Sequence, residues 1–501
     1  MNLSHEAQLA RADGCAQRGS RGGSRRSGLW SREVWRRSGL AVRVLPWLIS
    51  ILLLLAGLRS ATAQSLFESS PLAAEAPAAS EPDVPSAEPP VLTLEQRVVW
   101  LEEELQRQRE TAEASRSSPA QPSAMQFGGQ LQADVIWIGQ DSANRATVGD
   151  ARNLADFRRA RIAGRGQAFD VFEYVLAVDF ALVGRPSFLD VWGGVHDLPL
   201  LGNARVGHFF EPFSLERTTH NGRTTFMERS LAVALAPGRN LGIEAYDALG
   251  NEERASYQVG VFAGESNIYG EQFTDVGGVA ATGRLTWLPW WSDDERGFLH
   301  VGGAYSLRAP PSQRVFFAAY PEARAGAPSA ANIPPFVNTG VIGADMNQLF
   351  GVESALVHGP LYIQSEMTAT AVHQTGGPDL FFHGAYVNVS YFLTGEHRTY
   401  NKLFGIVDRV HPHENFFRVR TEGGAICTGR GAWEAAARYS YLDLTDANIQ
   451  GGVLRNVTIG VTWHLTALMR VKWEVIQADL DRAPVGESQA TIAGMRFDFE
   501  F

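Results

Sequence analysis

Three arginines at alternating positions of one short segment suggest a shared role. Arg159, Arg161 and Arg165 occupy odd positions of residues 157–168, so in a β-strand their side chains would lie on one face. Like charges crowded on one face are unfavourable in a dry core, but they are tolerated beside water and anions. The segment therefore predicts a watery path for anions with these arginines on its wall. The alternative is that each arginine pairs with an aspartate or glutamate and only holds the protein in shape.

Other arginines have surroundings that suit the same path. Arg205 and Arg284 have small or polar neighbours on the same strand face, so we expect both to join the pore lining. The long connection 210–238 contains a helix-like piece at 225–235, which suits inward folding as a constriction. Its candidate constriction residues are Arg217, Arg223 and Arg229.

The end of the chain shows the kind of strand that would position these arginines. From 493 to 501 the odd positions are apolar and mostly aromatic, whereas the even positions carry Gly, Arg, Asp and Glu. A membrane barrel turns such an apolar face to lipid and the charged face to its lumen. The alternative is an edge strand of a soluble sandwich. A chain that ends on Phe501 within such a strand resembles an outer-membrane protein carrying its signal for the barrel assembly machinery.

Sixteen segments show comparable patterns and predict an all-β protein, a 16-stranded antiparallel transmembrane β-barrel. This even number lies in the range of porin barrels and leaves a lumen wide enough for an aqueous channel. The expected strands are 127–138, 157–168, 171–182, 188–197, 203–209, 239–247, 255–264, 278–290, 297–309, 346–358, 360–373, 382–394, 430–444, 452–466, 468–481 and 489–501.

The connections follow from this strand list. With the N-terminus in the periplasm, the long connections 139–156, 210–238 and 310–345 lie outside the cell, as barrels prefer. The exception is 395–429, which is long and falls on the periplasmic side. We expect either a folded excursion there or a pair of strands that the pattern does not reveal.

The chain ahead of the barrel predicts export. An Arg-rich stretch precedes about 15 apolar residues and an Ala-Thr-Ala site, as in a signal peptide cleaved before Gln64; an uncleaved anchor is the alternative. A later seam at Leu94, Val98, Leu101 and Leu105 indicates a small trimeric coiled coil or a lone amphipathic helix. The expected organisation is signal peptide 1–63, disordered linker 64–91, short coiled-coil helix 92–113, linker 114–126 and porin β-barrel 127–501.

Six segments, in order along the chain, resemble the phosphate-selective porin O and P family. The resemblance covers roughly residues 127–501 and implies a homotrimeric, 16-stranded outer-membrane porin, with a loop folded into the lumen and an arginine-lined path for small anions such as phosphate. The family motif typically has a lysine before Glu211, where this chain has Phe210. The segments are 157–161 (FRRAR), 205–213 (RVGHFFEPF), 225–230 (TFMERS), 236–242 (APGRNLG), 393–396 (LTGE) and 431–444 (GAWEAAARYSYLDL).

The charge balance does not by itself favour anions. The chain without its first 63 residues has 34 basic and 51 acidic residues, and its only lysines are Lys402 and Lys472. Arginine can still hold phosphate through two parallel hydrogen bonds, so lysine is not indispensable.

Other classes of function lack support in the sequence. Motifs of serine hydrolases, P-loop enzymes and zinc proteases are absent, so we expect neither an enzyme nor a cofactor. His411, His413 and Glu414 lie in a loop, where solvation is expected rather than metal binding. The basic residues are not interleaved with aromatics, so nucleic acid is not an expected partner. The remaining alternative is a structural barrel that anchors the outer membrane to the cell wall, with little selective transport.

Overall fold

Alternating strands close into a ring in the computed structural model, which describes residues 125–169, 171–181, 186–264, 278–324, 333–420 and 426–501. The expected signal peptide, coiled coil and nearly all of both linkers lie outside the described residues and stay predictions. All 16 expected barrel strands are present, and the soluble sandwich is excluded. The strands are β1 (Gln126–Gln140), β2 (Leu154–Ala168), β3 (Phe172–Asp179), β4 (Ser187–Leu198), β5 (Gly202–Phe210), β6 (Arg239–Leu249), β7 (Ala255–Ala263), β8 (Val279–Trp291), β9 (Gly297–Ala309), β11 (Val337–His358), β12 (Leu361–Gln374), β13 (Leu380–Phe392), β18 (Ala432–Asp446), β19 (Ile449–His464), β20 (Met469–Arg482) and β21 (Gly486–Glu500).

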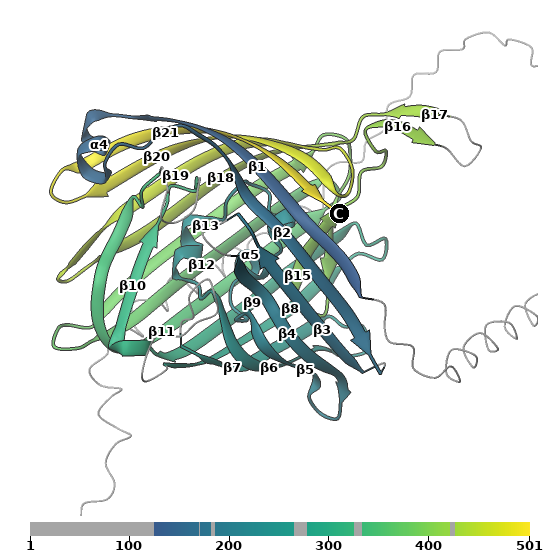
Figure 1. Cartoon of the computed structure of the whole chain (residues 1–501), viewed down its shortest axis with the longest axis horizontal. Coiled ribbons are helices and arrows are strands. Elements are labelled where there is room, and N and C mark those ends of the chain that lie inside the picture. The colour runs from purple at the N-terminus through teal and green to yellow at the C-terminus, as the bar shows by residue number, and fades with distance from the viewer. Residues whose placement is uncertain (1–124, 170, 182–185, 265–277, 325–332, 421–425) are drawn as a thin grey trace, which may run out of the picture. The chain divides into compact units, whose positions relative to one another are not determined.

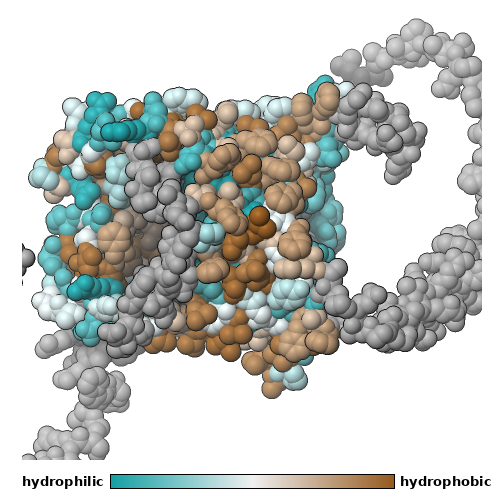
Figure 2. Space-filling view, in the orientation of Figure 1, coloured by the Kyte–Doolittle hydropathy of each residue, from teal (hydrophilic) through white to brown (hydrophobic). Residues whose placement is uncertain are grey.

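Each barrel strand pairs antiparallel with its sequence neighbours in the ring, and β21 closes the ring by pairing with β1 (Figure 1). In β21 the buried positions include Arg496, Asp498 and Glu500, whereas Met495 and Phe497 face outward, as the alternation predicts. Figure 2 shows apolar side chains over the middle of the visible outer wall and hydrophilic residues toward its left and right edges. This arrangement fits an apolar band in contact with lipid.

The last residue extends the closing strand pair. The backbone N–H of Phe501 donates to the Gly129 carbonyl at 3.2 Å, and the Gly129 N–H donates to the Phe501 carbonyl at 3.0 Å. Because an open sheet edge cannot persist in lipid, we expect deletion of Phe501 to lower the amount of assembled barrel. Surface labelling of cells producing the truncated chain measures this, and normal surface levels would contradict it.

The two ends of the barrel carry different connections. We call the end with Gln126 and Phe501 the N-terminal end and the opposite end the far end. At the far end β1 and β2 are joined through α4 (Ser142–Val148), and the lumen loop (211–238) joins β5 to β6. The covering segment (310–336), with η3 (Pro311–Gln313) and β10 (Arg314–Ala319), joins β9 to β11. β10 pairs with the first part of β11, which lies beyond the section of β11 that pairs with β9.

The long connection at the N-terminal end is a folded excursion, the first of the two expected possibilities. It contains two small separate sheets, one formed by β14 (Arg398–Asn401) with β15 (Ile406–Val410), the other by β16 (Phe417–Arg420) with β17 (Ile426–Gly429). We call residues 398–410 the lumen hairpin, because its side chains contact the inner face of the barrel. Among the described residues no helix has the length and apolar character needed to cross a membrane.

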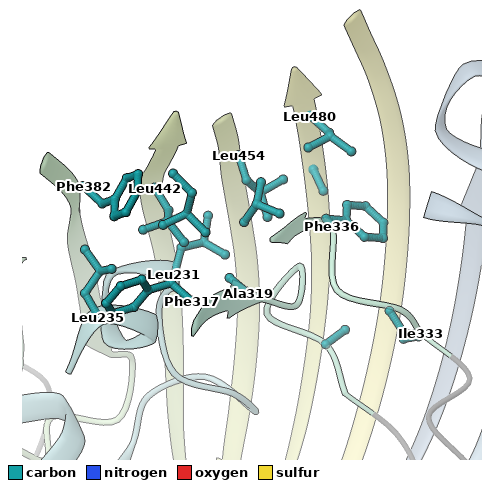
Figure 3. Packing of buried hydrophobic residues seen from close by; sticks show 14 of the residues in the cluster. Leu231, Leu235, Phe317, Ala319, Ile333, Phe336, Phe382, Leu442, Leu454 and Leu480 are labelled. Atoms are coloured by element: carbon teal, nitrogen blue, oxygen red, sulfur yellow. The ribbon is translucent and has the colours of Figure 1, made fainter. Parts of the chain in front are cut away.

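An apolar cluster fills part of the barrel interior toward the far end (Figure 3). The lumen loop contributes Leu231 and Leu235, and the covering segment contributes Phe317 and Phe336. These residues pack on inward-facing apolar side chains of the wall, including Phe382, Leu442, Leu454 and Leu480. Because packed apolar side chains exclude water, this sector of the wall cannot line a watery path.

Candidate functional site

The arginines of β2 meet the lumen loop inside the barrel. Arg159 is buried, donates to Gln132 Oε1 at 2.5 Å, and has its Nη1 3.7 Å from Glu228 Oε1. Arg161 donates through Nε to Asp179 Oδ2 at 2.8 Å. Arg165, near the C-terminal end of β2 and so at the N-terminal end of the barrel, is exposed and has no ion pair within the described part of the chain.

Arg158 also points inward, which strict alternation does not predict. Alternation puts Arg158 on the lipid face and so predicts a position near a membrane interface, where the cost of a charge is small. The register of β1 against β2 shifts between Gln132 and Ala133, so Arg158 is an extra residue in the ladder, a β-bulge. Its Nε and Nη2 donate to the two carboxylate oxygens of Glu228 at 2.9 and 3.0 Å. The expected lipid-side position of Arg158 is therefore wrong.

The lumen loop crosses the interior from the far end and contacts the wall near the N-terminal end. It contains α5 (Leu215–Thr218), η1 (Asn221–Arg223) and η2 (Leu231–Leu235). The helix-like piece expected at 225–235 is thus only a 3₁₀ turn at its end. A Cβ on Gly222 would overlap the carboxylate of Glu500, so any larger residue here would displace the ion-paired side chains of Glu500 and Arg470.

Cationic wall residues hold the lumen loop by its backbone. Lys472 donates to the carbonyls of Thr224 and Phe226 at 2.6 and 3.0 Å. Arg470 and Arg496 donate to the carbonyls of Gly222 and Met227. Since loop carbonyls inside a barrel need donors, these cations of β20 and β21 act as anchors of the loop rather than as free charges.

The three candidate arginines of the lumen loop have different surroundings. Arg223 pairs with Glu500 at 2.7 Å and with Asp408 of the lumen hairpin at 3.3 Å. Arg217 donates to the carbonyls of Val233 and Ala236 at 3.2 and 2.7 Å. Arg229 donates to the carbonyls of Glu216 and Thr219 at 2.7 and 2.8 Å. Among the described residues, only Arg223 of these three has an ion-pair partner.

The charge state of this loop follows from its neighbours. Burial and the Arg239 guanidinium lower the pKa of Arg217 to about 10, and burial with Arg217 lowers the pKa of Arg229 to about 9. Both side chains therefore keep their charge at neutral pH. Burial alone would raise the pKa of the Glu228 carboxyl, but Arg158 and Arg159 hold it well below its usual range. Glu228 is consequently an anion between several guanidiniums.

Arg205 and Arg284, both expected in the pore lining, contact carboxylates and the lumen hairpin. Arg205 donates to Glu244 Oε2 at 2.8 Å and its guanidinium lies 4.1 Å from the ring centre of Phe209. Arg284 is fully buried, pairs with Glu353 at 2.6 Å, and donates to the Gly405 carbonyl at 2.7 Å. Gly405 has a φ of 60°, which favours glycine at this tip. Arg284 thus anchors the hairpin. This is the structural role, pairing with a carboxylate to hold the protein in shape, that was the alternative to lining a pore.

One strand, β18, holds the inward segments from both ends. Glu434 pairs with Arg398 of the lumen hairpin at 2.6 Å. Arg438 pairs with Glu322 of the covering segment at 2.7 Å and donates to the Glu228 carbonyl of the lumen loop at 3.1 Å. Both residues belong to the segment GAWEAAARYSYLDL (431–444), whose alternation predicts an inward face but not these partners.

Sequence reasoning missed several lumen residues besides Arg158. Arg239, at the start of β6, pairs with Asp190 of β4 at 2.8 Å, and its guanidinium lies 3.7 Å from the ring centre of Phe210. The inward parity of β4 could have identified Asp190, but Arg239 shares the parity of the exposed Leu241 and Ile243, so alternation gives no signal for it. Nothing in the sequence shows that Phe210 and the loop arginines come together beside them.

A closed 16-stranded barrel with a charged interior and an apolar outer wall defines a porin-type channel protein of the outer membrane. The family model described as phosphate-selective porin O and P matches residues 125–501. The chain therefore belongs to this family, and the resemblance stated from its motifs is confirmed.

Individual relatives are distant. An uncharacterised protein of Caulobacter vibrioides is 27% identical over 335 residues, which are 65% of this chain and 62% of that protein. Porin O of Pseudomonas aeruginosa is 25% identical over 396 residues, 72% of this chain and 84% of Porin O.

Solved structures of similar fold include an anion-selective porin from Comamonas acidovorans, with 12% identity and a TM-score of 0.45 over 75% of this chain and 100% of that chain. The trimer form of OmpT from Vibrio cholerae has 12% identity and a TM-score of 0.43 over 76% of this chain and 100% of OmpT.

Proposed function

We propose that this porin is a passive channel that prefers small anions, with phosphate among the candidate solutes, and that its path runs past the arginines of β2 and of the lumen loop. The observation that carries the proposal is the charge around the loop. Arg217 and Arg229 have no ion-pair partner among the described residues, and Arg158, Arg159 and Arg161 face the same interior.

The acidic balance of the whole chain does not oppose this proposal. Charge on the exposed surface is screened within about 8 Å at physiological salt. Guanidiniums in a narrow, partly dehydrated lumen act on a passing ion at closer range and are screened less. The local charge of the path, rather than the net charge of the protein, should therefore set the selectivity.

We expect the purified protein in planar bilayers to show a reversal potential of anion-preferring sign under a KCl gradient. Changing Arg159, Arg161 and Arg165 together to glutamine should weaken or reverse this preference, because Asp179 and Glu228 then lose neighbouring cations. The matched control changes three exposed arginines, Arg145, Arg152 and Arg455, to glutamine. A cation-preferring wild type whose potential the triple change leaves unmoved would contradict the proposal.

The second candidate function, a structural barrel, is favoured by the packed interior. The lumen loop and covering segment share an apolar cluster, and the lumen hairpin adds another at the N-terminal end. The same bilayer recording separates the two candidates, because a structural barrel would show no ion current above background.

We also propose a homotrimer, as the family resemblance implies. Light scattering of the detergent-purified protein should give three barrels per particle, and removal of residues 64–120 should leave this number unchanged, since two heptads contribute little beside contacts between barrels. Monomers produced by the deletion would show instead that the coiled coil sets the oligomer.

A further inference from the structure

Phe210 lies where three guanidiniums converge, two of them from the lumen loop. It ends β5 and is half-buried. The guanidinium of Arg239 lies 3.7 Å from its ring centre, that of Arg229 5.6 Å and that of Arg217 6.0 Å. Each distance is within the range at which a cation is attracted by an aromatic ring. We call these four residues the Phe210 cluster.

The Phe210 cluster has more positive than negative charge. Arg239 is compensated by Asp190 at 2.8 Å. Arg217 and Arg229 have no ion-pair partner among the described residues and donate only to backbone carbonyls. The cluster therefore attracts an anion, and the carbonyls fix both guanidiniums before the anion arrives, which lowers the entropy cost of binding.

The donors that remain are few and include the buried Nε of Arg217. Arg217 uses Nη2, and Arg229 uses Nε and Nη2, for the loop carbonyls. The Nη1 groups of both arginines have no acceptor within the described residues. An anion held by these N–H groups would lie beside the Phe210 ring, because both guanidiniums are within 6.0 Å of its ring centre.

This arrangement discriminates between anions by shape and hydration. Inorganic phosphate carries oxygens on every side, and those facing the ring would lose water without gaining a donor, which is costly. A carboxylate has both oxygens at one end, where they fit a guanidinium fork. Its hydrocarbon part can then pack on the ring, a contact favoured by burial of apolar surface.

We propose that the Phe210 cluster is a resting site for monovalent organic carboxylates with an apolar body, in preference to inorganic phosphate. This inference rests on the proposed anion channel and deepens it by naming the substrate class. Phe210 acts as the specificity-determining residue, and the loop arginines supply the charge.

The test is block of the chloride current of the full-length protein in planar bilayers, with benzoate and phosphate as probes. In the wild type, benzoate should block at a concentration about tenfold lower than phosphate, as expected when phosphate oxygens lack donors. Phe210→Lys supplies a donor and a charge in place of the ring, and it should reverse this order. The matched control is Phe404→Lys, the same exchange at a half-buried phenylalanine of the lumen hairpin.

Four further outcomes decide the inference. Arg217→Gln with Arg229→Gln should weaken benzoate block at least about tenfold. Wild-type block that is equal for both probes, or an order that Phe210→Lys leaves unchanged, would overturn the inference while leaving an anion channel intact. A wild-type channel that prefers cations would overturn both the inference and the proposed function.

Discussion

Replacement of Arg438 with glutamine is expected to raise the single-channel conductance severalfold. The Arg438 side chain is fully buried, pairs with Glu322 of the covering segment, and lies 3.5 Å from Glu216 of the lumen loop. Breaking a buried pair by removing one partner costs roughly 3–5 kcal/mol. Local displacement of two loops relieves that cost without opening the barrel wall, so the current path should widen.

The control for this experiment is Arg455→Gln on β19, the same exchange at an exposed side chain. Glu322→Gln should act in the same direction as the Arg438 variant, because it leaves the Arg438 guanidinium without its closest carboxylate. Unchanged conductance in both variants, with the barrel intact on gels, would show that β18 does not hold the loops in place.

Replacement of Arg496 with glutamine should strongly destabilise the barrel itself. Arg496 on β21 lies opposite Asp134 on β1 in the closing strand pair and donates to both carboxylate oxygens of Asp134, at 2.7 and 2.6 Å. It also pairs with Glu228 of the lumen loop at 2.7 Å. Its loss leaves buried carboxylates without a neighbouring cation, which should lower the free energy of unfolding by roughly 3–5 kcal/mol.

The stability of the barrel can be followed as the temperature at which the fast-migrating band of an unboiled sample shifts to the unfolded position. We expect Arg496→Gln to lower this temperature clearly. Adding Asp134→Asn should make the decrease smaller, because the double change removes the unpaired carboxylate. If this temperature falls equally in the single and double variants, the Arg496–Asp134 pair does not stabilise the closing pair of β1 and β21.

The sequence alone determined the strands and their faces. Alternation has a period of two residues, so a strand and its outward side are encoded by near neighbours. This is why all 16 strands, the lipid face of β21 and the inward position of Arg159 and Arg161 could be predicted. A single inserted residue reverses the predicted faces. Arg158 is an example, because the β-bulge that turns its side chain inward depends on the pairing of β2 with β1.

Only the tertiary structure decided what the inward residues do. Arg284 and Arg438 have the same lumen-facing parity as a pore-lining arginine, yet their partners come from segments 121 and 116 residues away. The apolar inner face of β18 to β21 likewise makes sense only once the covering segment and η2 lie against it. These contacts form when the barrel closes and brings distant segments into one enclosed space. A local pattern of residues does not indicate which segments will meet there.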